Sequence, residues 1–247
     1  MTNTKNLIIV AGHAAFKDIY SQEQIEPEKD IFWTLQPFQL GEAKYYIEHI
    51  KYGVNLLKTN PNSILIFSGG FTRESSKQWS EANSYYKTAS YYNFWDTDNE
   101  YNLQKRIFLE EYARDSFENL LFCICRYKQL TSDYPLSITI VSWKFKKERF
   151  LFHNKVLEFP KNQFFFNGIL NPENLKDAIY GEKKALNYFQ NNLYGSEGLL
   201  LNKRNNRNPL GKKIPYYNLK ELKEFFTFIN DPNNIQNYYT NKLPWNT

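Results

Sequence analysis

Side chains able to do chemistry gather in the stretch from residue 109 to 119, after a short apolar run and before a helical pattern. It holds two acids, an arginine, a hydroxyl and an amide: Glu110, Asp115, Arg114, Ser116 and Asn119. Carboxylates can carry protons, and the other three groups can hold an anion or a nucleotide-like ligand. We therefore predict catalytic roles for Glu110 and Asp115 and ligand binding for Arg114, Ser116 and Asn119.

Two earlier apolar runs end in residues of the same kind. Residues 7–11 lead into Gly12 and His13, and a histidine there can act as a general base or bind a phosphate oxygen. Residues 64–67 lead into a turn whose glycine amides can approach an anion. His13 is thus a third candidate catalytic residue, and the predicted ligand-binding residues at these two ends are Gly12, Ser68, Gly69, Gly70, Arg73 and Glu81.

A fourth apolar run, residues 137–141, is followed by Ser142 and by a helical pattern from about Phe145. On that helix Lys146, Arg149 and His153 would share one face as a cationic wall. We predict that Ser142, Lys146 and Arg149 bind the ligand. Each charge-assisted hydrogen bond to an anion can contribute roughly 1.5 to 3 kcal/mol.

Structural explanations stand beside these roles. Asp115 and Glu118 have the spacing of a capping box, which is worth about 1 kcal/mol and needs no ligand. Arg114 can pair with Glu110 or Glu81, and His13 can simply bond to the next loop. The sequence leaves these alternatives open.

The elements that must position these residues alternate along the chain. Apolar runs at 7–11, 64–67, 106–109, 137–141 and 164–166 predict strands, and the first lacks polar alternation, as in a buried parallel sheet. Helices are predicted over 41–57, from Ser80, over 117–127, from about 145, over 174–193 and over 218–229, and the polar segment 93–102 ends the second. Residues 16–38 are predicted to be a packed connection, held by Trp33 and Phe38.

This alternation indicates an α/β, Rossmann-like three-layer sandwich with a mainly parallel sheet of about five strands and a C-terminal helical extension. We assign residues 1–170 to the domain and 171–247 to an extension packed on it. Ligands in such folds bind beyond the carboxyl ends of the strands, where the polar residues fall.

Composition narrows the class of protein. Of the 247 residues, 42% are hydrophobic, which is typical of a globular chain. The net charge of +5 is only weak support for binding of nucleic acid. The basic segment 203–213 is predicted to be a solvated or internally paired loop. Cys123 and Cys125 are predicted to be small buried residues. The first apolar run is too short to span a membrane, so we expect a cytoplasmic protein without membrane contact.

Several catalytic signatures are missing from the sequence. It has no paired-histidine motif, no cysteine cluster, no Walker loop, no G-x-G-x-x-G turn and no G-x-S-x-G elbow. We therefore predict no metal site, although Glu81, Glu110 and Asp115 could hold a hard cation through oxygen. Covalent serine chemistry is disfavoured, and Ser68, Ser116 and Ser142 are interpreted as hydroxyl ligands.

The order and spacing of these strand-end motifs resemble the YdcF-like family, which includes SanA and ElyC and is catalogued as domain of unknown function 218. The motifs are Ser68-Gly69-Gly70, Ser80-Glu81-Ala82, Glu110 with residues 113–119, and Ser142 with Phe145 and Arg149. Gly195 and residues 203–209 resemble an extension of its cytosolic, fungal-type branch. Lys146 and Ala113 depart from the bacterial pattern, which commonly has histidine and serine there.

The resemblance implies a Rossmann-like sheet with the motifs at one edge, but no settled reaction. A family link to S-adenosylmethionine implies that ligand as a candidate cofactor. Two hypotheses follow. The first is binding, with hydrolysis or transfer as a further step, of a phosphorylated or nucleotide-like small molecule. The alternative is a non-catalytic module for an adenosine-containing ligand, in which an acid such as Glu110 bonds the ribose. The sequence fixes neither turnover nor protein partners.

Overall fold

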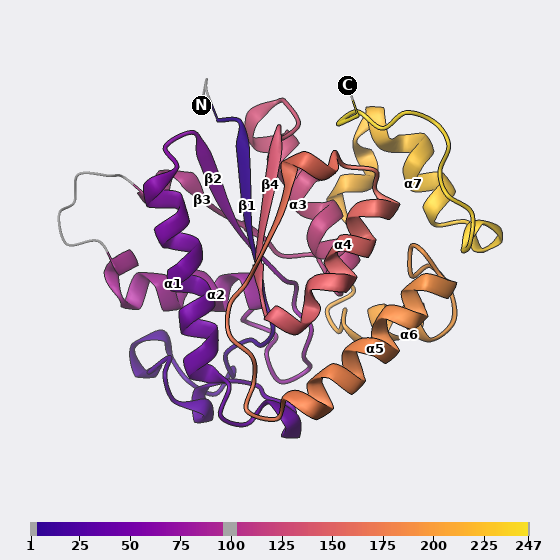
Figure 1. Ribbon diagram of the computed structural model, residues 1–247. Helices are drawn as coiled ribbons and strands as arrows, with labels where there is room; N and C mark the ends of the chain where they lie inside the picture. Colours follow the sequence, from indigo (N-terminus) through magenta and orange to yellow (C-terminus); the bar gives the residue numbers. More distant parts are fainter. Residues whose placement is uncertain (1–3, 96–102, 247) are drawn as a thin grey trace.

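A five-stranded parallel sheet forms the centre of the computed structural model, which describes residues 4–95 and 103–246 (Figure 1). The strands are β1 (Asn6–Ala11), β2 (Ser63–Ser68), β3 (Ile107–Glu110), β4 (Ser137–Ser142) and β5 (Phe164–Gly168). Their order is β3-β2-β1-β4-β5, and each neighbouring pair is parallel. The predicted α/β, Rossmann-like class is confirmed.

The middle residues of the inner strands are mostly apolar and buried because helices cover both faces of the sheet (Figure 1). On one face, α1 (Ala43–Thr59) and α2 (Glu81–Tyr91) pack over Val10 and Leu65. On the other, α3 (Ser116–Thr131) and α4 (Lys147–Val156) belong to the core that contains Leu7 and Ile9. The strands are therefore held in place from both sides.

The C-terminal segment adds three helices beyond α3 and α4: α5 (Leu175–Asn191), α6 (Gly198–Asn206) and α7 (Lys223–Ile229) (Figure 1). Phe189, Leu200 and Phe225 belong to the same buried cluster as Leu7. The segment 203–213 was predicted to be a solvated or internally paired loop; residues 203–206 are instead the last turn of α6, and Arg204 within them is internally paired with Asp115.

Helix starts follow the predicted caps. The Ser80 hydroxyl accepts a hydrogen bond from the Asn83 amide at 2.8 Å, and α2 begins at the next residue. Asp115 caps α3 in the same way. After α2, residues 93–95 form a short 3-10 helix, and residues 96–102 of the predicted polar segment lie outside the described residues.

The connection at 16–38 has a buried aromatic residue, Trp33, and ends in an exposed one, Phe38. The indole of Trp33 is buried against Phe16, with ring centroids 4.3 Å apart. Phe38 is 71% exposed, so the prediction that it packs inward is wrong. Cys123 and Cys125 are free and buried, as predicted. Within the described residues, the helices are all too short or too polar to cross a membrane.

Close packing of α1 on the sheet depends on Gly53. A Cβ at this position would lie 2.3 Å from Cγ2 of Val10. We expect Gly53→Ala to lower the free energy of unfolding by about 1–3 kcal/mol, because overpacking outweighs the better helix propensity of alanine. Gly181 of α5 is the matched control, since a Cβ there would meet nothing within 4 Å. Gly181→Ala should be neutral or stabilising by up to about 1 kcal/mol in urea denaturation.

Candidate functional site

The sheet reverses its strand order at β1, because β2 and β3 lie on one side of it and β4 and β5 on the other. Such a reversal leaves a crevice beyond the carboxyl ends of the two central strands. A cavity of about 670 Å³ lies at this place. Its walls come from the residues after β1, β2, β3 and β4 and from α5 and α6.

Most of the predicted site residues line this cavity. They are Gly12, His13, Arg73, Glu81, Arg114, Asp115, Ser116, Asn119, Lys146 and Arg149. Five others are not among the lining residues: Ser68, Gly69, Gly70, Glu110 and Ser142. The residues that follow the strands thus come together as expected. Many of their side chains, however, form hydrogen bonds or ion pairs with other residues of the protein.

The glycine turn does not offer its amides to an anion. The amides of Gly12, Gly69 and Gly70 donate to the carbonyls of Ser68, Glu110 and Ala113 at 2.7, 2.9 and 2.7 Å. A Cβ on Gly12 or Gly69 would lie 2.7 Å from the Cβ of Glu81. These two glycines therefore make room for Glu81, whose carboxylate accepts a hydrogen bond from Thr72.

Glu110 is fully buried behind the cavity wall. Its carboxyl accepts hydrogen bonds from the Ser68 hydroxyl at 2.8 Å and from the Tyr112 and Ala113 amides, and the Tyr216 hydroxyl lies at 3.3 Å. Burial raises the pKa of Glu110 to about 7. Asn119 donates to the same Ser68 oxygen at 2.8 Å. This cluster closes the β2 and β3 ends, and it leaves Glu110 without access to a ligand.

Asp115 is held in a cap and an ion pair. Its carboxylate accepts from the Glu118 amide at 3.0 Å and from Nε of Arg204 at 2.6 Å. Burial alone would raise the pKa of Asp115, but the Arg204 guanidinium holds it well below the usual range. Asp115 is therefore an ionised structural anion, which does not suit a proton donor.

Arg114 and Glu118 correct two further expectations. Glu118 does not reach back to the Asp115 amide, as a capping box requires; it accepts from the Arg114 amide at 2.9 Å instead. The Arg114 guanidinium pairs with this carboxylate at 2.5 and 2.9 Å, and not with Glu110 or Glu81. Its charge is already compensated at the cavity wall.

The predicted cationic wall is only partly cationic. Both Arg149 nitrogens that point to α5 donate to the Glu182 carboxylate at 2.8 Å. His153 is buried, its Nε2 lies 2.8 Å from the Ser116 hydroxyl, and burial lowers its pKa well below the usual range. The Nδ1 atom of His153 has no partner among the described residues, so no third group orients a serine–histidine pair for nucleophilic attack.

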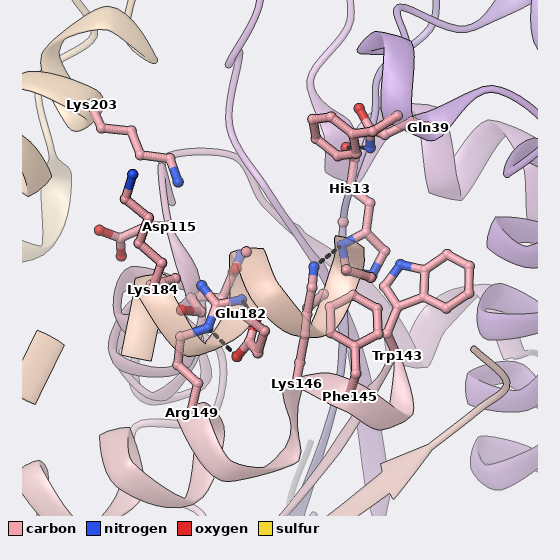
Figure 2. A pocket seen from close by; sticks show the side chains of 18 of the residues that line it. His13, Gln39, Asp115, Trp143, Phe145, Lys146, Arg149, Glu182, Lys184 and Lys203 are labelled. Carbon is pink, nitrogen blue, oxygen red and sulfur yellow. Dashed lines mark hydrogen bonds and ion pairs between the residues drawn. The ribbon is translucent and has the colours of Figure 1, made fainter. Parts of the chain in front are cut away.

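His13 and Lys146 meet across the point where the strand order reverses (Figure 2). Nζ of Lys146 lies 3.0 Å from Nδ1 of His13, and the Ser142 hydroxyl lies 3.4 Å from Nε2. Burial, followed by the charge of Lys146, lowers the pKa of His13 well below its usual value. Burial and the charge of Arg149 lower the pKa of Lys146 to about 7. His13 is therefore neutral, a weak base and, once protonated, a strong acid.

Four more cations surround the cavity without acidic partners. Within residues 4–95 and 103–246, no carboxylate lies within ion-pair distance of Arg73, Lys184, Lys203 or Arg207, and all four side chains line the cavity. The Nε atom of Arg73 is buried and unpartnered in that same part of the chain. Desolvation and the charge of Arg207 lower the pKa of Lys203. These four cations share the cavity lining with the carboxylates of Glu42, Glu81 and Asp177, and among the described residues none of the seven groups forms an ion pair.

Sequence reasoning missed Lys184, Lys203 and Arg207. The last two were assigned to a loop. Leu199, Lys203 and Arg207 follow one another at intervals of four residues, a helical spacing that could have revealed one shared face. A helix from Gly198 brings both to the cavity, and Arg204 between them turns to Asp115. Among the described residues, no three or more His, Cys, Asp or Glu side chains form a group that could hold a metal ion.

The buried pair of Asp115 and Arg204 predicts a large loss of stability when it is broken. Arg204→Gln leaves the Asp115 carboxylate buried with less compensation, and we expect a loss of about 3–5 kcal/mol in the free energy of unfolding. Lys203→Gln, one residue earlier and without an ion-pair partner, removes a poorly solvated charge and should not lower the free energy of unfolding. Adding Asp115→Asn to Arg204→Gln should cost less than the sum of the single changes; additive losses would mean that the pair is not coupled.

The raised pKa of Glu110 predicts that the free energy of unfolding depends on pH. Since its pKa is raised to about 7, the folded chain binds its proton more tightly than the unfolded chain does. The wild type should therefore lose up to about 3 kcal/mol of stability relative to Glu110→Gln as the pH rises from about 4.5 to 7. Urea denaturation of both proteins across this range measures the difference, and a constant difference would contradict the raised pKa.

Comparisons with known proteins place the chain near one protein of undescribed role. No family model matches the chain, and no solved structure matches it. It is similar to the uncharacterized protein YOR238W of Saccharomyces cerevisiae, with 28% identity over 267 aligned residues that cover 87% of this chain and 88% of the yeast protein. The aligned part of this chain is longer than residues 1–170. The similarity therefore extends into the C-terminal segment that supplies Lys203 and Arg207.

Proposed function

We propose that this chain binds a phosphorylated, nucleotide-like small molecule in the cavity at the carboxyl edge of its sheet. The observation that carries the proposal is a group of four cations around that cavity that form no ion pair among the described residues: Arg73, Lys184, Lys203 and Arg207. Burial lowers the pKa of Lys203 and of Arg207, and a charged group in such a place gains from a ligand that brings negative charge. A phosphate or pyrophosphate group meets this requirement with several oxygen acceptors.

The size and the remaining walls of the cavity fit a ligand larger than phosphate alone. A volume of about 670 Å³ is in the range of small-molecule sites. In Figure 2, Lys184 and Lys203 lie on one side, and Trp143 and Phe145 lie with His13 on the other. A ligand with a charged end and a planar end would use both sides, the second through ring stacking.

Hydrolysis or transfer of the phosphoryl group would rely on His13. Of the three residues predicted to carry protons, Glu110 lies behind the wall and Asp115 is held by Arg204. His13 lines the cavity and is neutral, which suits a general base. We propose this step only together with binding, and we propose the relation to YdcF-like proteins on the strand-end motifs alone.

A second candidate is a non-catalytic site for an adenosine-containing ligand such as S-adenosylmethionine. Glu81 favours it, because its carboxylate lines the cavity and makes no ion pair with any described residue. An acid in this position can accept hydrogen bonds from ribose hydroxyls. Glu81 thus takes the place that the sequence suggested for Glu110.

Thermal denaturation with a set of ligands separates the two candidates. We expect inorganic pyrophosphate and ATP to raise the melting temperature of the wild type, since both bind the folded chain through phosphate. Arg73→Gln and Lys203→Gln should each weaken pyrophosphate binding about tenfold, as the loss of one charge-assisted contact implies.

Lys213→Gln is the matched control, because Lys213 belongs to the same basic segment, is exposed and does not line the cavity. Its pyrophosphate affinity should equal that of the wild type. Equal stabilisation by adenosine and S-adenosylmethionine, with none by pyrophosphate, would favour the second candidate. A melting temperature unmoved by all of these compounds would contradict both.

A further inference from the structure

The Lys146 amine occupies an unusual position for a lysine. It comes from the turn Lys144–Lys146 after β4, lines the cavity and lies 3.0 Å from Nδ1 of His13. No described carboxylate forms an ion pair with it. The nearby acids are engaged elsewhere, Glu182 with Arg149 and Glu42 with the Tyr46 hydroxyl at 2.7 Å.

This environment favours the neutral amine. The charged groups around Lys146 are Arg149 from its own segment, Glu182 from α5, Glu42 before α1, Glu81 from α2, and the imidazole of His13 after β1. Burial and Arg149 outweigh the acids and bring the pKa to about 7. A neutral amine that donates one hydrogen to His13 keeps its lone pair for another partner.

We propose that the Lys146 amine attacks the carbonyl carbon of a phosphorylated aldehyde or ketone in the cavity and forms an imine with it. A nitrogen–carbon bond forms, and the carbonyl π electrons move to oxygen. One amine proton moves to that oxygen, giving a carbinolamine. Departure of the hydroxyl with a second proton releases one water and leaves the carbon–nitrogen double bond. The balance needs no oxidant and no other reactant.

His13 is placed to carry the protons of this step. Its Nδ1 lies 3.0 Å from Nζ of Lys146, so in the tautomer that carries its proton on Nε2 it can take the proton that the attacking nitrogen loses and return it to the departing hydroxyl. Its lowered pKa makes the protonated ring a strong donor. The apolar neighbours Trp143 and Phe145 lie beside the pair and reduce access of water (Figure 2).

The substrate class rests on the proposed function, because Lys184 and Lys203 would hold the phosphate while the carbonyl meets Lys146. In Figure 2 these two lysines lie across the cavity from the His13 and Lys146 pair. A compound that carries both groups can therefore engage both sides. Phosphate binding sets which carbonyl compounds enter, and the amine determines what happens to them.

The test is reduction in the presence of a small probe. The full chain is incubated with glycolaldehyde phosphate or with glycolaldehyde, reduced with borohydride and mapped by peptide mass spectrometry. We expect the phosphorylated probe to label Lys146 at pH 7 at least about tenfold faster than lysines with an ordinary pKa, since a far larger fraction of its amine is neutral. Its labelling rate should level off above about pH 8, whereas that of exposed lysines keeps rising to about pH 10. Pyrophosphate should block the labelling.

Lys146→Arg keeps the positive charge and should abolish this adduct, and Lys147→Arg, at the exposed neighbouring residue, should keep it. Labelling that falls mainly on Lys203 or on surface lysines would overturn the proposal, whether or not the variants fold, because the wild type alone reports it. Stabilisation by pyrophosphate without a Lys146 adduct would overturn the imine and leave the proposed function standing. Equal labelling by the two probes, unaffected by pyrophosphate, would overturn the phosphorylated substrate class.

Discussion

The buried ion pair between Asp115 and Arg204 is the contact on which the cavity depends. It joins the N-terminus of α3, at the edge of the sheet, to α6 of the C-terminal segment. Burying two charges is expensive, and the close geometry and the helix cap together offset that cost. Because Arg204 is fixed, Lys203 on the same helix and Arg207 directly after it are brought to the cavity. A structural contact thus determines where the uncompensated charges lie.

The ionisable groups of the site fall into two classes, those that form an ion pair and those that do not. Arg114 and Arg149 are neutralised by Glu118 and Glu182, so they shape the wall more than they attract a ligand. Burial and the charges of Arg207, Arg149 and Arg73 lower the pKa of Lys203, so poor solvation and repulsion disfavour its charged amine. An anion relieves this cost, and a neutral amine such as that of Lys146 avoids it.

The sequence predicted the framework because its signals are local. Unbroken apolar runs marked the strands, periodic apolar residues marked the helices, and Ser80 and Asp115 marked helix starts. Parallel strands share one edge, which explains why most of the predicted site residues line one cavity. What the sequence could not supply was the choice of partner. Glu110 turned inward to Ser68, and Arg114 chose Glu118, because such choices depend on burial and on residues distant in the chain.

The place of Arg204 in the chain also orders the assembly of the protein during synthesis. All five strands and the residues at their ends leave the ribosome before α6 does, so the sheet can form while Asp115 still lacks its guanidinium partner. Until residue 204 docks, the start of α3 carries a carboxylate that burial disfavours and water must solvate. The start of α3 therefore stays hydrated until α6, which is synthesised after all five strands, docks and brings the Arg204 guanidinium to Asp115.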